Sequence, residues 1–169
     1  MPNSKTLPPR PGRPGFPKGY GISSKEEGLL SWSWLSERMG KARNYWVGTT
    51  RPDGRPHSMP VWGVWVDEAL YFGTGSDTRK AHNLAENPAM LIHLESGDEV
   101  VILEGVAQVA EEAAVLSLVD DAYEAKYKMR AVSENKNAVW YTLKPRIALG
   151  WTEKEFPANA TRWVFPDAG

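Results

Sequence analysis

Short runs of alternating apolar and polar residues, separated by turn sequences, dominate the chain from residue 44 to residue 165. A period of two is the periodicity of a β-strand, whose successive side chains point to opposite faces of a sheet. The first run, NYWVGTT, ends in a turn at Asp53-Gly54, and the second, PHSMPVWGVWV, ends in a turn at Asp67-Glu68. The later runs read ALYFGT, AMLIHLE, VVILEGVAQVA, AVWYTL, RIALGW and TRWVF. The pattern therefore predicts a mainly β fold, with six or seven antiparallel strands forming a small barrel.

The second run, residues 56–66, is expected to form one strand whose two faces differ. Pro60 inside this run indicates a sheet edge or a bulge, because proline cannot donate a ladder hydrogen bond. One face is predicted to carry Trp62, Val64 and Val66, and the other Met59, Val61 and Trp65.

Two segments are expected to form helices beside the barrel. Ser24-Lys25-Glu26-Glu27 fits a capping box and precedes an apolar stripe, so a helix is predicted from there to about Met39. A second helix is predicted from Glu111 to about Arg130. Its inward-facing residues are expected to be Val115, Leu118, Val119 and Ala122.

Composition limits the domain organisation and the classes of function. With 169 residues the chain is expected to form one domain, residues 22–169, preceded by an arm, residues 1–21, that carries six of the 13 prolines. This arm is expected to be disordered or to lie over a partner. The net charge of −1 argues against a nucleic-acid partner, and no apolar run is long enough to span a membrane. The absence of cysteine fits a reducing cytoplasm.

The stretch TGSDTRKAHNLAENP, residues 74–88, predicts an anion site. It reads as a strand end, a Gly-Ser-Asp turn and a short helix that ends at Asn87-Pro88. Arg79 and Lys80 then lie in the first helical turn, where the helix dipole disfavours cations and favours anions. Hydroxyl donors precede them in the turn, so a phosphate group of a ligand would explain the arrangement, although a solvated surface pair is the commoner origin of such a motif. The three histidines lack ligand spacing, and no metal site is expected.

Four motifs together resemble the pyridoxamine 5′-phosphate oxidase-related split-barrel flavoproteins. They read RPHSMPVWGVW, YFGTGSDTRKAHNLAENP, VILEGVAQV and LKPRIALGW…TRWVF, and they occur in the order found in that family over residues 34–165. The resemblance implies a six-stranded split β-barrel that forms a homodimer. It also implies that FMN, or alternatively the deazaflavin coenzyme F420, binds in a groove between the subunits.

The resemblance also implies which residues would form the site. Thr78, Arg79 and Lys80 would hold the cofactor phosphate, and Trp151 and Arg162 would face the ring or the substrate from the neighbouring subunit. The wall beside the ring would be formed by Met59, Pro60, Val61, Trp62, Gly63, Val64, Gly73 and Thr74. In the oxidase itself, the positions of Met59 and Val64 are Arg and Lys, and that of Val100 is Gln. Oxidation of vitamin B6 is therefore not expected, and the chain looks closer to the branch that includes F420-dependent reductases. Arg51, Arg55, Lys41 and Arg43 would meet the acidic tail of F420 if they line the same groove.

Two classes of function follow. The first is an oxidoreductase that transfers a hydride between FMN or F420 and a small conjugated substrate, with the chemistry supplied mainly by the cofactor. The second is a non-catalytic protein that binds a flavin, heme or other tetrapyrrole, because no acid or base is clearly assigned.

Overall fold

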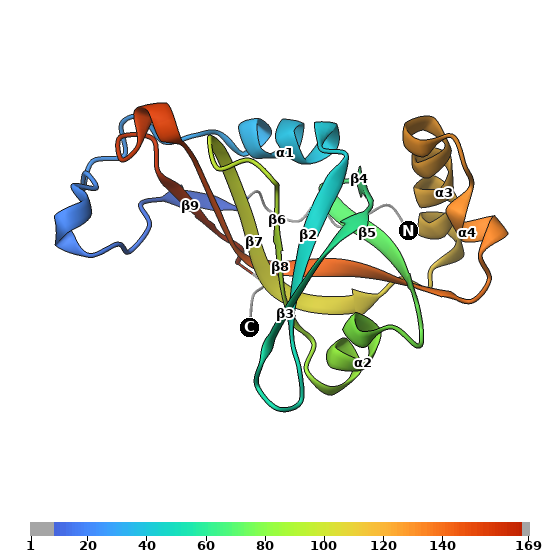
Figure 1. Cartoon of the computed structure of the whole chain (residues 1–169). Helices are drawn as coiled ribbons and strands as arrows, with labels where there is room; N and C mark the ends of the chain where they lie inside the picture. The colour runs from blue at the N-terminus through green and yellow to red at the C-terminus, as the bar shows by residue number, and fades with distance from the viewer. Residues whose placement is uncertain (1–8, 167–169) are drawn as a thin grey trace.

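Strands β2 to β8 form a barrel in the computed structural model, which describes residues 9–166 (Figure 1). The strands are β1 (Arg10–Gly12), β2 (Asn44–Thr50), β3 (Pro56–Trp62), β4 (Val64–Val66), β5 (Ala69–Gly75), β6 (Ala89–His93), β7 (Glu99–Val109), β8 (Ala138–Thr152) and β9 (Thr161–Val164). The helices are α1 (Trp32–Lys41), α2 (Arg79–Glu86), α3 (Ala113–Tyr127) and α4 (Ala131–Glu134), with 3-10 turns η1 (Lys18–Tyr20) and η2 (Glu153–Glu155).

Antiparallel pairing runs around the barrel in the order β3, β2, β6, β7, β8, β5 and β4. Because β4 continues from β3 after the single residue Gly63, these segments form one closed circuit of six strands. The expected mainly β fold with an antiparallel split barrel is confirmed. Its interior holds alternate residues of the strands, such as Tyr45 and Val47 of β2, together with Trp163 of β9, all of which are fully buried.

The expectation of one continuous strand over residues 56–66 is wrong, because the strand breaks at Gly63. A Cβ at this position would lie 2.8 Å from the carbonyl oxygen of Tyr71, so only glycine fits between the strands. The two sides of the break face different surroundings. Trp62 is 42% exposed, whereas Val64 is 2% exposed, so these two side chains do not share one face.

The helix predicted from Ser24 is also wrong at its start. Helix α1 begins at Trp32, and the Ser31 side chain caps it by accepting a hydrogen bond from the Trp34 amide. The preceding segment is held by tertiary contacts instead. The Arg13 guanidinium donates to the carbonyl oxygens of Lys25 and Glu27, which a helix would need for its own hydrogen bonds.

The helix predicted after Glu111 is present as α3, but one of its expected inward residues is wrong. Val119 is fully buried, whereas Leu118 is 50% exposed. Figure 1 places α3 at the side of the barrel, with α1 across one end and α2 at the other end.

Residues 9–21 of the proline-rich segment contact the barrel end of the same chain rather than extending free of it. Strand β1 pairs with β9, with Gly12 opposite Arg162, and Arg13 also donates to the carbonyl oxygens of Ala158 and Ala160. Residues 1–8 of the expected arm lie outside the described residues. Within residues 9–166, no helix is long and apolar enough to cross a membrane.

Candidate functional site

The barrel has an open seam between β3 and the end of β5. Among residues 9–166, β3 pairs only with β2, while residues 72–75 of β5 pair only with β8. We call these two unpaired edges the seam. Most side chains of β3 are exposed, and Met59 is 46% exposed. The strand also carries Pro56 and Pro60. An exposed edge rich in apolar side chains favours a bound ligand or a second chain.

Helix α2 begins at the end of β5 and so places its first turn beside the seam. The Thr78 side chain caps the helix by accepting from the Ala81 amide, and Thr78 Oγ1 lies 3.0 Å from Thr74 Oγ1. Lys80 is half-buried, and its ammonium donates to Thr74 Oγ1 at 3.0 Å. Arg79 is exposed. The predicted phosphate-binding residues Thr78, Arg79 and Lys80 are therefore together, and the wall residue Thr74 joins them.

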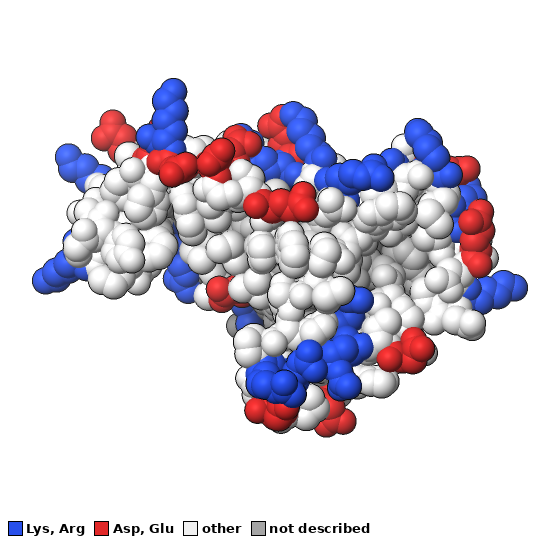
Figure 2. All heavy atoms as spheres, viewed as in Figure 1, with Lys and Arg blue, Asp and Glu red and all other residues white. Residues whose placement is uncertain are grey.

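The electrostatics of this turn favour an anion. Within residues 9–166 neither Arg79 nor Lys80 has an ion pair with a carboxylate. Burial lowers the pKa of Lys80, which means that its charge is poorly solvated where it lies. The pKa of His57 is lowered by burial first, and then by the positive charges of Arg51, Lys80 and Arg79. Figure 2 shows Lys and Arg side chains gathered at the lower part of the molecule, where Figure 1 places α2 and the β2–β3 hairpin.

Hydrogen bonds fix α2 to the barrel. Asn83 is fully buried in α2, and its amide donates to Thr49 Oγ1 of β2 at 2.9 Å. Thr49 Oγ1 in turn lies 3.3 Å from His57 Nδ1 of β3. Neither Asn83 nor a contact between His57 and α2 was predicted from the sequence. The only available signal was a polar residue on the apolar face of a short helix.

A cavity of about 210 Å³ reaches the α2 turn through Thr74, which lines the cavity and also contacts Thr78 and Lys80. Its walls include Trp62 from β3, Gly73 and Thr74 from β5, and Tyr123 of α3 with Trp140 of β8. Trp140 is 5% exposed, and its indole nitrogen has no partner among the described residues. Ligand sites generally measure about 300–1,000 Å³, so this cavity accommodates only part of a cofactor-sized molecule.

The remaining predicted wall residues differ in their access to the seam. Met59, Pro60 and Trp62 are exposed, and Val61 is half-buried. Gly63 is buried, and the Val64 side chain packs with Val119, Tyr123 and Trp140. At Val64, only the backbone can contribute to a ligand site.

Trp151 and Arg162 lie away from this cavity in the same chain. Trp151 pairs with Val100 and contacts Phe16 and Phe156, with ring centroids 6.1 and 5.9 Å apart. Along β8, Trp151 is 11 residues beyond Trp140, which is roughly 36 Å of extended strand at 3.3 Å per residue. Arg162 is paired with Gly12 and Leu149 at the β1–β9–β8 edge. One chain therefore does not bring these two residues to the α2 turn.

The four cations that were expected to meet the acidic tail of F420 do not lie together in one chain. Arg51 lies close enough to His57 to lower its pKa together with the α2 cations. Arg55 is paired with Asp53 in the hairpin turn, and Lys41 is paired with Glu37 on α1. Arg43 lies over the rings of Trp62 and Tyr127.

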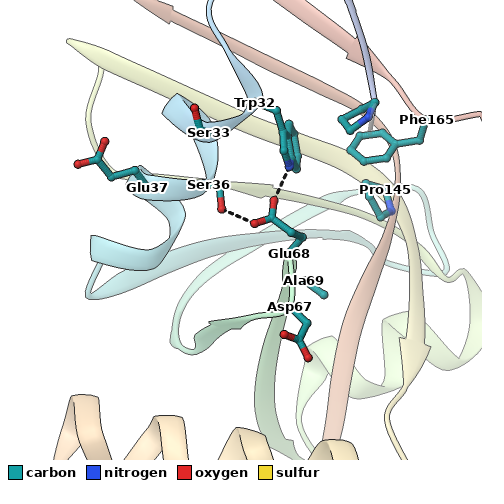
Figure 3. A pocket seen from close by; sticks show the side chains of 10 residues that line it. Trp32, Ser33, Ser36, Glu37, Asp67, Glu68, Ala69, Pro145 and Phe165 are labelled. Atoms are coloured by element: carbon teal, nitrogen blue, oxygen red, sulfur yellow. Dashed lines mark hydrogen bonds between the residues drawn. The ribbon is translucent and has the colours of Figure 1, made fainter. Parts of the chain in front are cut away.

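A second pocket, of about 560 Å³, lies between α1 and the β4–β5 turn (Figure 3). The Glu68 carboxylate accepts hydrogen bonds from the Trp32 indole and from Ser36 Oγ, the latter at 2.8 Å. Glu37 and Asp67 also line it, so the pocket carries three carboxylates. These charges would repel a phosphate, and the pocket contains none of the predicted cofactor-binding residues.

The fold and the anion-favouring helix start beside the open seam define the class of the protein, which is that of the split-barrel proteins. The chain belongs to the pyridoxamine 5′-phosphate oxidase family, whose sequence pattern matches residues 35–151. No curated protein matches the chain by sequence.

Solved structures show the same fold. A conserved hypothetical protein of Mycobacterium tuberculosis is 24% identical, with a TM-score of 0.67 over 76% of this chain and 88% of that chain. An F420 reductase is 18% identical, with a TM-score of 0.55 over 71% of this chain and 98% of that chain. A heme storage protein of Vibrio cholerae is 17% identical, with a TM-score of 0.57 over 68% of this chain and 89% of that chain.

Proposed function

We propose that this protein is a cytoplasmic oxidoreductase that uses FMN, or alternatively F420, to transfer a hydride to or from a small conjugated substrate. The observation that carries the proposal is the start of α2. There, two cations without carboxylate partners among the described residues, two threonine hydroxyls and helix N–H groups meet beside an exposed strand. A phosphate monoester would balance the charge of the two cations and accept from N–H groups of this turn, although the Thr78 hydroxyl itself already donates to the Gly75 carbonyl oxygen.

The residues present fit such a cofactor. Lys80 and Arg79 would hold the phosphate, and the exposed side of β3 would lie along the chain that joins phosphate to ring. Trp62, Gly73 and Trp140 would enclose the ring, and the Trp140 indole N–H is a donor without a partner among the described residues. When bound, the cofactor supplies the hydride chemistry, while the protein fixes its orientation and excludes water.

The proposal includes a homodimer in which the partner completes the site. The cavity beside α2 is smaller than a cofactor, and the seam exposes apolar side chains that a second chain would cover. Trp151 and Arg162 would then approach the ring or the substrate from the neighbouring subunit. In that role, the indole N–H and the guanidinium would donate to a substrate oxygen.

Absorbance spectroscopy and ligand titration test the cofactor assignment. The purified protein should show the visible absorbance of bound flavin, or else bind added FMN or F420 with a change in cofactor fluorescence. Native mass spectrometry should then show two chains with two cofactors. The proposal would be refuted if neither cofactor binds at concentrations far above the dissociation constants typical of flavoproteins.

The second candidate is a binding protein without turnover, for a flavin, heme or other tetrapyrrole. One observation favours it: among the described residues that line the cavity there is no aspartate, glutamate, histidine or lysine that could serve as an acid or base. Structural similarity to a heme storage protein is consistent with it. Tight binding of heme or flavin, with no turnover by nicotinamide or reduced deazaflavin donors, would favour this candidate over the oxidoreductase.

A further inference from the structure

The last turn of α3 contacts the strand break at Gly63. Lys126 donates from its ammonium to the Gly63 carbonyl oxygen at 2.8 Å and to the Tyr45 hydroxyl at 2.9 Å. Tyr127 accepts from the Gly63 amide at 3.1 Å, and its hydroxyl lies 2.9 Å from the Gly63 carbonyl oxygen. Two side chains from one helix therefore satisfy both backbone groups of this residue.

These contacts replace hydrogen bonds that the sheet does not supply. Trp62 is the last residue of β3 to pair with β2, and Val64 is the first residue of β4 to pair with β5. Gly63 lies between the two ladders and is buried, and a buried backbone group without a hydrogen-bond partner destabilises the fold. The α3 side chains thus hold the point at which the strand changes partners.

The same turn fixes the side chain next to Gly63. The Trp62 ring stacks on Tyr127 with centroids 4.6 Å apart and planes 4° apart, and Arg43 lies over both rings. Trp62 is nevertheless 42% exposed, and it lines the cavity that also contains Gly73 and Thr74. Its position is therefore set by α3, while part of its surface stays accessible beside the phosphate-binding turn.

We propose that Lys126 and Tyr127 are positioning residues that hold Trp62 as a wall for the planar ring of the bound ligand. This inference rests on the proposed function for the identity of the ligand. Neither residue needs to touch the ligand, because both act through Gly63 and Trp62. The α3 helix would then control how tightly the site holds a ring, while α2 controls how tightly it holds a phosphate.

Fluorine NMR of protein labelled with 5-fluorotryptophan tests the positioning without any ligand. Trp62→Phe assigns the Trp62 resonance. Lys126→Met and Tyr127→Phe should move or broaden that resonance, since each removes hydrogen bonds to Gly63. Lys128→Met is the matched control, because the Lys128 ammonium donates to the Ala125 carbonyl oxygen and not to Gly63, so the resonance should stay in place. An unmoved Trp62 resonance in both test variants would overturn the inference.

Ligand titration then distinguishes the contact with the ring from the contact with the phosphate. Riboflavin provides a ring without phosphate, and FMN provides a ring with phosphate. Lys126→Met should weaken both ligands by the same factor, roughly 2- to 12-fold, which is the range for one aromatic stacking contact. A double-mutant cycle with Trp62→Leu should be non-additive, because Lys126 acts through Trp62.

Additive losses in that cycle, or a loss confined to FMN, would overturn the positioning role. If the wild-type protein binds neither FMN nor F420, the proposed function fails. The NMR comparison still decides the positioning of Trp62 in that case, so the two failures are distinguishable.

Discussion

Replacement of Lys80 by methionine should separate ligand binding from stability. Methionine is close to lysine in length and apolar volume but carries no charge. In the ligand-free protein the Lys80 ammonium is half-buried, and its one hydrogen bond to a described residue goes to the hydroxyl of Thr74. A charge that is removed from water without an opposite charge destabilises the fold. Lys80→Met should therefore leave the free energy of unfolding unchanged or raise it.

The same substitution should weaken phosphate binding. A charge-assisted hydrogen bond contributes about 1.5–3 kcal/mol, so the Kd for FMN should rise by about 10- to 150-fold. The Kd for riboflavin should stay within about twofold, because the ring does not depend on this contact. Lys154→Met, at an exposed lysine of η2, is the control for the loss of one charge.

The pH dependence follows from the lowered pKa of Lys80. Because burial lowers this pKa in the folded state, the unfolded chain binds more protons between that value and the usual 10.5. The free energy of unfolding of the wild-type protein should therefore rise relative to that of Lys80→Met as pH rises toward 10.5. The stability advantage of the variant should be largest below the folded-state pKa of Lys80. Urea denaturation at several pH values measures it. A variant that is less stable at pH 7 and binds FMN like the wild type would refute the reasoning.

Three further substitutions test other parts of the molecule. Gly73→Ala would place a Cβ 2.9 Å from the buried Trp140 ring, so unfolding free energy should fall by about 1–3 kcal/mol in urea titrations; an unchanged value would show that the ring can shift. Asp120→Asn should cost about 1–3 kcal/mol at pH 7. Burial alone would raise the pKa of Asp120, but hydrogen bonds from Ser133, Val132 and Arg130 lower it overall. The loss of stability in the variant should therefore shrink as pH falls below about 3.8. Equal acid sensitivity of the wild type and the variant would contradict this prediction. Trp151→Ala should reduce turnover more than melting temperature, because the side chain is only half-buried; a variant that simply unfolds would assign Trp151 to the core.

Local rules in the sequence were sufficient for most of the strands and for the anion-favouring start of α2. Alternation over residues 44–50 fixed which side chains of β2 enter the core, because a strand has only two faces. Asp53-Gly54 specified the first hairpin turn, where Gly54 has a φ of +83°. Arg79 and Lys80 are adjacent in the chain, so their position at the start of α2 required no knowledge of the tertiary structure.

Contacts between distant segments decided the features that the sequence analysis missed. Residues 24–30 carry a good capping sequence, yet Arg13 binds their carbonyl groups and α1 starts only after Ser31. The break at Gly63 depends on the Tyr71 carbonyl and on side chains of α3, more than 60 residues later.

The sequence by itself determined most of the strands and their turns and an anion-favouring helix start, because each depends on residues within a few positions of one another. Only the tertiary structure decided that β3 and β5 leave an open seam, that Trp62 rests on Tyr127, and that Trp151 lies far along β8 from the α2 turn. These features arise from the closure of the barrel, in which pairing partners are selected by packing across the whole chain rather than by local propensity.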